Sequence, residues 1–138
     1  MAQILDMQRI RYLNLFEKIT KVSTKNCFFY NNFVIFAVPS FCMSKAIGNK
    51  GENVKKLSSL FEKKVKIVSS PKSIRDAEKF IASIIEPLNF KSFKITSDSI
   101  IISANKENKA LLIGRNKTRF MELGKIVKDI FNKNLRIV

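Results

Sequence analysis

Apolar and polar residues alternate along the chain in two ways, one with the spacing of a helix and one with that of a strand. Four apolar side chains near the N-terminus recur at helical spacing and predict one buried face on a helix over residues 4–20: Ile10, Leu13, Phe16 and Ile19. Two β-rich stretches follow, separated by the turn-forming pair Asn31–Asn32, which predicts a hairpin.

The rest of the first half continues with two helices and one strand. The elements predicted after the first helix are strands at Lys25–Tyr30 and Phe33–Val38, a short helix near Ser44–Ile47, a helix from Glu52 to Phe61, and a strand at Val65–Val68.

The second half predicts the same elements in the same order. Its elements are a helix capped by Ser73 and running to Ile85, with Ile74, Ala77, Phe80, Ile81 and Ile84 inward, strands at Phe90–Ile95 and Ser99–Ala104, a short helix at Lys106–Ile113, a longer helix at Thr118–Phe131, and a strand at Leu135–Val138.

Residue identities support this internal repeat. Gly48 recurs as Gly114, an offset of 66, whereas "LFEKKVKIV" at 60–68 matches "IFNKNLRIV" at 130–138, an offset of 70. The four extra residues therefore belong to the last helix of the second copy, where they add about one turn. We predict an α+β protein with two domains, 1–70 and 71–138. Each domain runs helix–strand–strand–helix–helix–strand, as a three-stranded sheet with helices on one face.

Charge narrows the choice of partner. The 138 residues carry 26 Lys and Arg against 11 Asp and Glu, a net charge of +15. The excess is even, with 12 basic against 4 acidic residues in 1–70 and 14 against 7 in 71–138. A surplus of this size favours a polyanionic partner through long-range attraction and counterion release. A plain lysine-rich solvated surface is the alternative.

The side chains that catalysis and metal binding need are scarce. There is no His and there are two Cys, so a four-ligand zinc site is excluded, and Cys27 and Cys42 are expected to be core thiols. The carboxylates are scattered singly, which disfavours a metal-dependent nuclease. We expect no enzymatic activity, no cofactor and no small-molecule substrate. Without a signal pattern or a long apolar run, we also expect a cytoplasmic protein with no membrane partner.

The stretch "AIGNKGENVKKL" at 46–57 carries the strongest functional signal. Two glycines three residues apart at the mouth of a helix let backbone approach a ligand closely, and the helix N-terminus favours an anion there. Val54 is as consistent with a place in the core as with an RNA-binding groove, and Leu57 is more consistent with the core. Lys55 is as consistent with a solvated surface charge as with a phosphate contact. The candidate contact residues of this turn are Ile47, Gly48, Asn49, Lys50, Gly51, Val54 and Lys55.

A G-x-x-G turn between two helices of such a unit resembles a KH domain, and the element order resembles the type II form. The resemblance implies that single-stranded RNA lays its phosphates on this turn and its bases on an apolar groove. The second copy departs from the motif, because "GRNK" places Lys117 where the second glycine is expected. A Cβ there crowds a phosphate or resists an unusual backbone angle. Gly114, Arg115, Asn116 and Lys117 are therefore a weakened RNA site or a purely structural turn.

Over its whole length the chain resembles archaeal NusA proteins, with the most specific part between Arg11 and Leu60. That resemblance implies a transcription elongation and termination factor that binds nascent RNA, with RNA polymerase as a candidate partner. Two alternatives stay open: a KH protein of ribosome assembly or RNA chaperoning, and a scaffold whose basic surface meets an acidic protein. Co-purification with RNA polymerase rather than with pre-ribosomes would separate the first alternative from the transcription factor.

Overall fold

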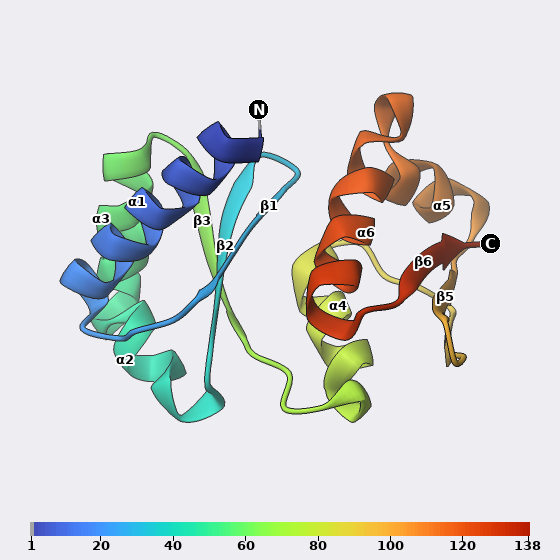
Figure 1. The fold of residues 1–138 in the computed structure, drawn as a ribbon, viewed down its shortest axis with the longest axis horizontal. Coiled ribbons are helices and arrows are strands. Elements are labelled where there is room, and N and C mark those ends of the chain that lie inside the picture. The colour runs from blue at the N-terminus through green and yellow to red at the C-terminus, as the bar shows by residue number, and fades with distance from the viewer. Residues whose placement is uncertain (1) are drawn as a thin grey trace. The chain divides into compact units, whose positions relative to one another are not determined.

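The computed structural model describes residues 2–138, and side chains from residue 7 onward. Its internal contacts divide the chain into two compact units, Met1–Pro71 and Lys72–Val138. Each unit holds one three-stranded sheet and its own helices (Figure 1). The predicted α+β class is confirmed, and the element order of each unit matches the type II KH arrangement. No helix in the described part of the chain is long and apolar enough to cross a bilayer.

The first unit follows the predicted order with small shifts at the ends of elements. Its elements are α1 (Ala2–Thr20), β1 (Asn26–Tyr30), β2 (Phe33–Val38), a 3₁₀ turn η1 (Ser40–Cys42), α2 (Met43–Ile47), a 3₁₀ turn η2 (Asn49–Gly51), α3 (Glu52–Phe61) and β3 (Lys64–Ser69).

The first sheet has the order β1–β2–β3, with β1 antiparallel and β3 parallel to β2. Asn31 and Asn32 join β1 to β2 with φ values of 51° and 64°. Two central residues with positive φ give a hairpin turn whose twist matches that of the flanking strands, so the predicted turn is confirmed. The parallel pairing needs a crossover, and α2 and α3 supply it.

Helix α1 buries an aromatic face against the sheet. Tyr12, Phe16 and Thr20 lie four residues apart and are all buried. The Phe16 ring stacks on Phe36 of β2 with centroids 4.2 Å apart, and Tyr12 lies 4.3 Å from Phe61 of α3. Aromatic side chains bury large apolar areas, so this stripe decides the rotation of the helix.

That rotation corrects one prediction. Ile10 was predicted on the buried face, but its side chain is 57% exposed. Leu13 and Ile19 are half-buried at the margin of the core, and only Phe16 of the four predicted residues lies at its centre.

Both cysteines are free thiols in this unit. Cys27 of β1 is buried, and this burial raises the pKa of its thiol to about 12, against the lowering effect of the Arg9 charge. Cys42 is half-buried and packs against the same core. The prediction of core thiols is confirmed for Cys27, and Cys42 lies at the edge.

The second unit repeats the plan. Its elements are a 3₁₀ turn η3 (Ile74–Asp76), α4 (Ala77–Ile85), β4 (Ser92–Ile95), β5 (Ser99–Ser103), α5 (Lys106–Ile113), a 3₁₀ turn η4 (Arg115–Lys117), α6 (Thr118–Phe131) and β6 (Asn134–Ile137). The sheet order is β4–β5–β6, again with one antiparallel and one parallel pair.

The predicted strands of this unit are shifted by one or two residues at their ends, and the start of the unit differs from the prediction in two further details. The Ser73 hydroxyl caps the 3₁₀ turn rather than α4, by accepting a hydrogen bond from the Arg75 amide at 3.3 Å. Ile74 lies in that turn and is half-buried, whereas the other four residues predicted to point inward are buried.

Helix α6 has 14 residues where α3 has 10, as the change of offset from 66 to 70 predicts. Both helices end in the same way, with a left-handed residue after the last turn, Glu62 at φ 54° and Asn132 at φ 55°. The extra turn therefore lies within α6 and leaves the start of the last strand unchanged.

Candidate nucleic-acid interface

The turn between α2 and α3 is built from an unusual run of backbone angles. Gly48 has φ 82° and ψ 171°, Lys50 has φ 55° and ψ 29°, and Gly51 has φ 72° and ψ 22°. Three of four consecutive residues thus have positive φ, which L-residues with a side chain seldom adopt. Helix α3 begins directly after this run, at Glu52.

The two glycines of the turn serve different needs. A Cβ on Gly48 would lie 3.0 Å from the Asn53 side chain and 3.1 Å from its backbone nitrogen, so the fold itself requires a glycine here. A Cβ on Gly51 would meet nothing within 4 Å. Its left-handed backbone favours glycine but does not demand it, because a side chain there would project into open space.

Internal hydrogen bonds hold the turn in shape. The Gly48 amide donates to the Ser44 carbonyl at 3.0 Å, and the Gly51 amide donates to the Gly48 carbonyl at 3.2 Å. The Asn53 side chain amide donates back to the Lys45 carbonyl at 3.2 Å and so ties α3 to α2. We call this last bond the brace of the turn.

The exposed part of the turn consists of the residues predicted to meet RNA. Asn49 and Lys50 are exposed, and Gly51 caps α3 without any side-chain hydrogen bond. The Glu52 amide donates to the Asn49 carbonyl. The positive end of the helix dipole nevertheless favours an anion at this end of α3. Lys55 is exposed one turn further along α3.

The apolar candidates lie closer to the core. Ile47 and Val54 are half-buried and pack against the core cluster, so each keeps an accessible part. Leu57 is 0% exposed, so it is a core residue and lines no groove. The structure therefore brings Ile47 and Val54, but not Leu57, to the side of the turn.

The second turn has the same backbone conformation without its second glycine. Gly114 has φ 75° and ψ 174°, Asn116 has φ 56° and ψ 28°, and Lys117 has φ 61° and ψ 22°. Lys117 therefore adopts the left-handed angles that Gly51 adopts in the first unit. A Cβ on Gly114 would lie 3.0 Å from Arg119, which is the counterpart of Asn53.

The brace is also repeated, with a different donor. An Arg119 guanidinium nitrogen donates to the Leu111 carbonyl at 3.3 Å, eight residues back, as Asn53 does to Lys45. Asn53 and Arg119 were missed by the sequence analysis. Their positions five residues after the first glycine, at the common offset of 66, are the signal that identifies them.

The two turns differ most in charge. Around the first turn, Lys50 and Lys55 are accompanied by Glu52 in the first turn of α3. Around the second turn, Arg115, Lys117 and Arg119 gather, and the first turn of α6 has no acidic residue. The described residues contain no group of three or more side chains suited to hold a metal ion.

Comparison with known proteins adds a relationship to this geometry. No family model matches the chain. A protein of Methanocaldococcus jannaschii named probable transcription termination protein NusA is 36% identical over 89 residues, 64% of this chain and 47% of the relative. A Halococcus morrhuae protein of the same name is 28% identical over 109 residues, 77% of this chain and 76% of the relative. The chain is a distant homologue of archaeal NusA proteins.

The chain spans about half the length of the Methanocaldococcus jannaschii relative. A solved structure agrees on the architecture: the crystal structure of APE1850 superposes with a TM-score of 0.68 at 20% identity, over 96% of this chain and 99% of that one. That likeness establishes a shared fold for the two proteins.

Proposed function

We propose that this chain binds single-stranded RNA and acts on transcription, as a NusA-like elongation or termination factor. The observation that carries the proposal is the exposed turn Gly48–Gly51. It opens α3 with three residues of positive φ and no capping side chain. The names of the two archaeal relatives supply the process, transcription termination. Nascent RNA is then the ligand, RNA polymerase the candidate protein partner, and the cytoplasm the place of action.

In this proposal each of the domains 1–70 and 71–138 is one KH-type domain. Phosphates lie against the backbone of Gly48 and Gly51, the Lys50 ammonium supplies charge, and the Asn49 amide supplies a hydrogen bond. Lys55 extends the charge along α3, and the accessible parts of Ile47 and Val54 support bases. Nothing in these roles requires a cofactor, a metal ion or a covalent step.

The second turn is a supporting site in this proposal. Arg115, Asn116 and Lys117 attract the backbone of the RNA, and Gly114 keeps the turn in shape. The Lys117 side chain begins where Gly51 leaves open space, so a phosphate approaches this backbone less closely. The contribution of the second turn is therefore mainly electrostatic and more sensitive to salt.

A charge-reversal pair tests the assignment. The double variant Asn49→Asp, Lys50→Asp places two carboxylates where phosphates are expected, and both positions are exposed. Affinity for an unstructured RNA, measured by fluorescence anisotropy, should fall at least tenfold, which is about 1.4 kcal/mol. The melting temperature should change little, because exposed substitutions cost within about 0.5 kcal/mol.

Two matched variants make this test specific. Asn14→Asp with Lys18→Asp changes the charge equally on the exposed face of α1 and should leave affinity nearly unchanged. Arg115→Asp with Asn116→Asp should weaken binding less than the first pair does. If the second turn proves the more sensitive, or if affinity does not fall as salt rises, the assignment of the first turn as the main phosphate site is wrong.

A further inference from the structure

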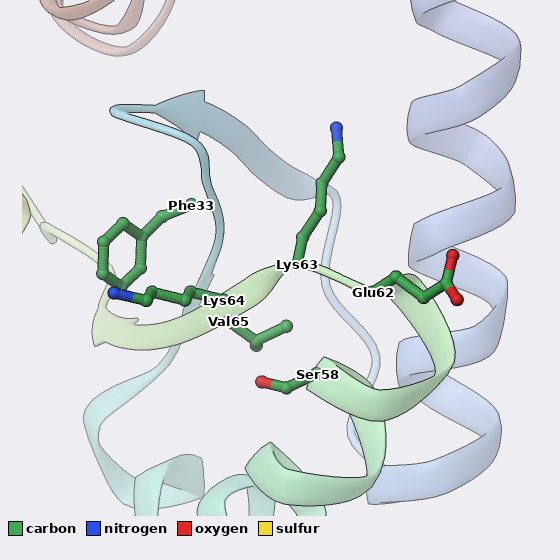
Figure 2. A pocket seen from close by; sticks show the side chains of 6 residues that line it. All are labelled: Phe33, Ser58, Glu62, Lys63, Lys64 and Val65. Atoms are coloured by element: carbon green, nitrogen blue, oxygen red, sulfur yellow. The ribbon is translucent and has the colours of Figure 1, made fainter.

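An aromatic side chain and two lysines meet at one corner of the first sheet. Phe33 opens β2 and pairs in register with Lys64, the first residue of the parallel strand β3. The Lys64 Nζ lies 5.7 Å from the centroid of the Phe33 ring, and the Lys66 Nζ lies 5.3 Å from it. We call these three residues the Phe33 platform. Figure 2 shows the Lys64 nitrogen beside the ring.

Phe33 and Lys64 of the platform line an open hollow of about 480 Å³. Its other walls come from the end of α3 and the start of β3: Ser58, Glu62, Lys63 and Val65. In Figure 2 the Glu62 carboxylate points away from the Phe33 ring, and the Lys63 side chain, in the bend before β3, also extends away from the ring. The hollow therefore presents an aromatic ring with the Lys64 ammonium beside it, and its one carboxylate is turned away from the ring.

The fold does not require this arrangement, as the second unit demonstrates. The residue at the corresponding start of β5 is Ser99, which pairs in register with Asn134 of β6. The counterpart of Lys66 is Arg136, so one cation remains but the ring and the other lysine are gone. A parallel strand pair forms there without them. The parallel pairing of β2 with β3 therefore does not depend on the Phe33 ring and Lys64.

The chemistry of the platform suits one nucleotide of a single strand. An aromatic face stacks a base without regard to its identity, and nearby ammonium groups attract the phosphates on either side. Exposed cation–π contacts are weak, so the exposed Lys64 can leave the ring for a phosphate when a base covers it. A duplex keeps its bases stacked inside and cannot use the ring.

The glycine turn and the hollow beside the platform lie at opposite ends of helix α3. The turn precedes the first residue of α3, whereas Ser58 and Glu62 belong to its far end. A helix of 10 residues is about 15 Å long, and a few nucleotides can span that length between the turn and the hollow. We propose that Phe33 and Lys64 form a second contact for single-stranded RNA, with one base stacked on the Phe33 ring and Lys64 beside its phosphate. This inference rests on the proposed function, since the RNA that contacts the platform is the same RNA that binds the glycine turn.

A single tryptophan gives a direct readout, because the natural chain has none. In Phe33→Trp the new indole should lose fluorescence as an unstructured RNA is titrated, since a stacked base quenches it. The matched control is Phe41→Trp, at a position of the same unit where the natural side chain is 88% exposed. Its fluorescence should hold steady over the same titration. Equal quenching of both, or of neither, overturns the inference.

Affinity provides the second measurement. Phe33→Leu keeps an apolar side chain but removes the aromatic face, and should weaken RNA binding about tenfold. Phe33→Tyr should stay within about twofold of the natural protein. If both variants bind like the natural protein, the platform does not contact RNA. The proposed function fails separately, if the natural protein itself does not bind single-stranded RNA or is indifferent to the Asn49→Asp, Lys50→Asp change.

Discussion

The two glycine turns have the same backbone conformation and different surfaces. Both keep a glycine at the first position, where φ is 82° in one and 75° in the other, and both are braced by the side chain five residues later. They differ at the fourth position, where Gly51 and Lys117 adopt the same left-handed angles. The first glycine is therefore required by the chain itself. The second is not required by the fold, since Lys117 takes the same angles, and in the proposed function it lets a phosphate approach the backbone closely.

The largest effect is expected from the position that both turns share. Gly48→Ala and Gly114→Ala each place a Cβ about 3.0 Å from the bracing residue, in a backbone region almost confined to glycine. Each should lower the free energy of unfolding by about 2 kcal/mol or more. Urea denaturation of both variants measures this loss.

Gly51→Ala is the control for that experiment. Its Cβ meets no neighbour, so only the left-handed backbone remains unfavourable, at about 1 kcal/mol. If Gly48→Ala is tolerated as well as Gly51→Ala, the distinction between the two glycines disappears.

A smaller effect on stability is expected at Lys133, which precedes the last strand of the second unit, than at the first glycines of the turns. The Lys133 Nζ donates to the Thr96 carbonyl at 2.7 Å and to the Ser97 carbonyl at 2.9 Å, which ties β6 to the hairpin of the second unit. Lys133→Met should cost about 1 kcal/mol of stability, because two partly exposed charged hydrogen bonds are lost. Thermal or urea unfolding measures it.

Lys63 occupies the corresponding place in the first unit, just before β3, and its side chain extends away from that strand (Figure 2). Lys63→Met should change stability by no more than about 0.5 kcal/mol. Equal losses for the two variants would contradict this difference between the units.

The smallest effect comes from exchanging the fourth residues of the turns. Lys117→Gly should raise stability by about 0.5 kcal/mol, since a left-handed lysine is relieved while chain entropy offsets part of the gain. Gly51→Lys should weaken RNA binding about threefold despite its added charge, because the side chain hinders close approach. Anisotropy titrations at low and high salt measure both exchanges. Tighter binding of Gly51→Lys at both salt concentrations would mean that charge, and not approach, governs the turn.

Local patterns in the sequence were enough to predict the order of the elements. The hairpin at Asn31–Asn32 and the bounds of β2, α3, α5 and α6 follow from turn residues and apolar spacing, and the structure has them as predicted. The rotation of α1 was missed, because Ile10 and Tyr12 begin neighbouring apolar stripes. Spacing alone does not say which of the two stripes contacts the sheet.

Features that join distant parts of the chain could not be predicted. The bond from Asn53 to the Lys45 carbonyl depends on the angle between two helices, which the turn between them sets. Phe33 meets Lys64 and Lys66 only through the register of a parallel strand pair. The left-handed angles of Lys117 contradict the ordinary preference of a lysine, and the surrounding turn imposes them.

The braces at Asn53 and Arg119 have a consequence for which positions of the two turns can change. Each brace fixes the shape of its turn through a backbone carbonyl, and so makes no contact with the side chains at the tip. The Asn53 amide and the Arg119 guanidinium donate equivalent hydrogen bonds, so the bracing residue itself can differ between the two turns. The tips Asn49–Lys50 and Arg115–Asn116 differ in sequence, whereas the loop that presents them keeps one conformation. We therefore expect a substitution at either tip to change what its turn binds without disturbing the folding of its unit.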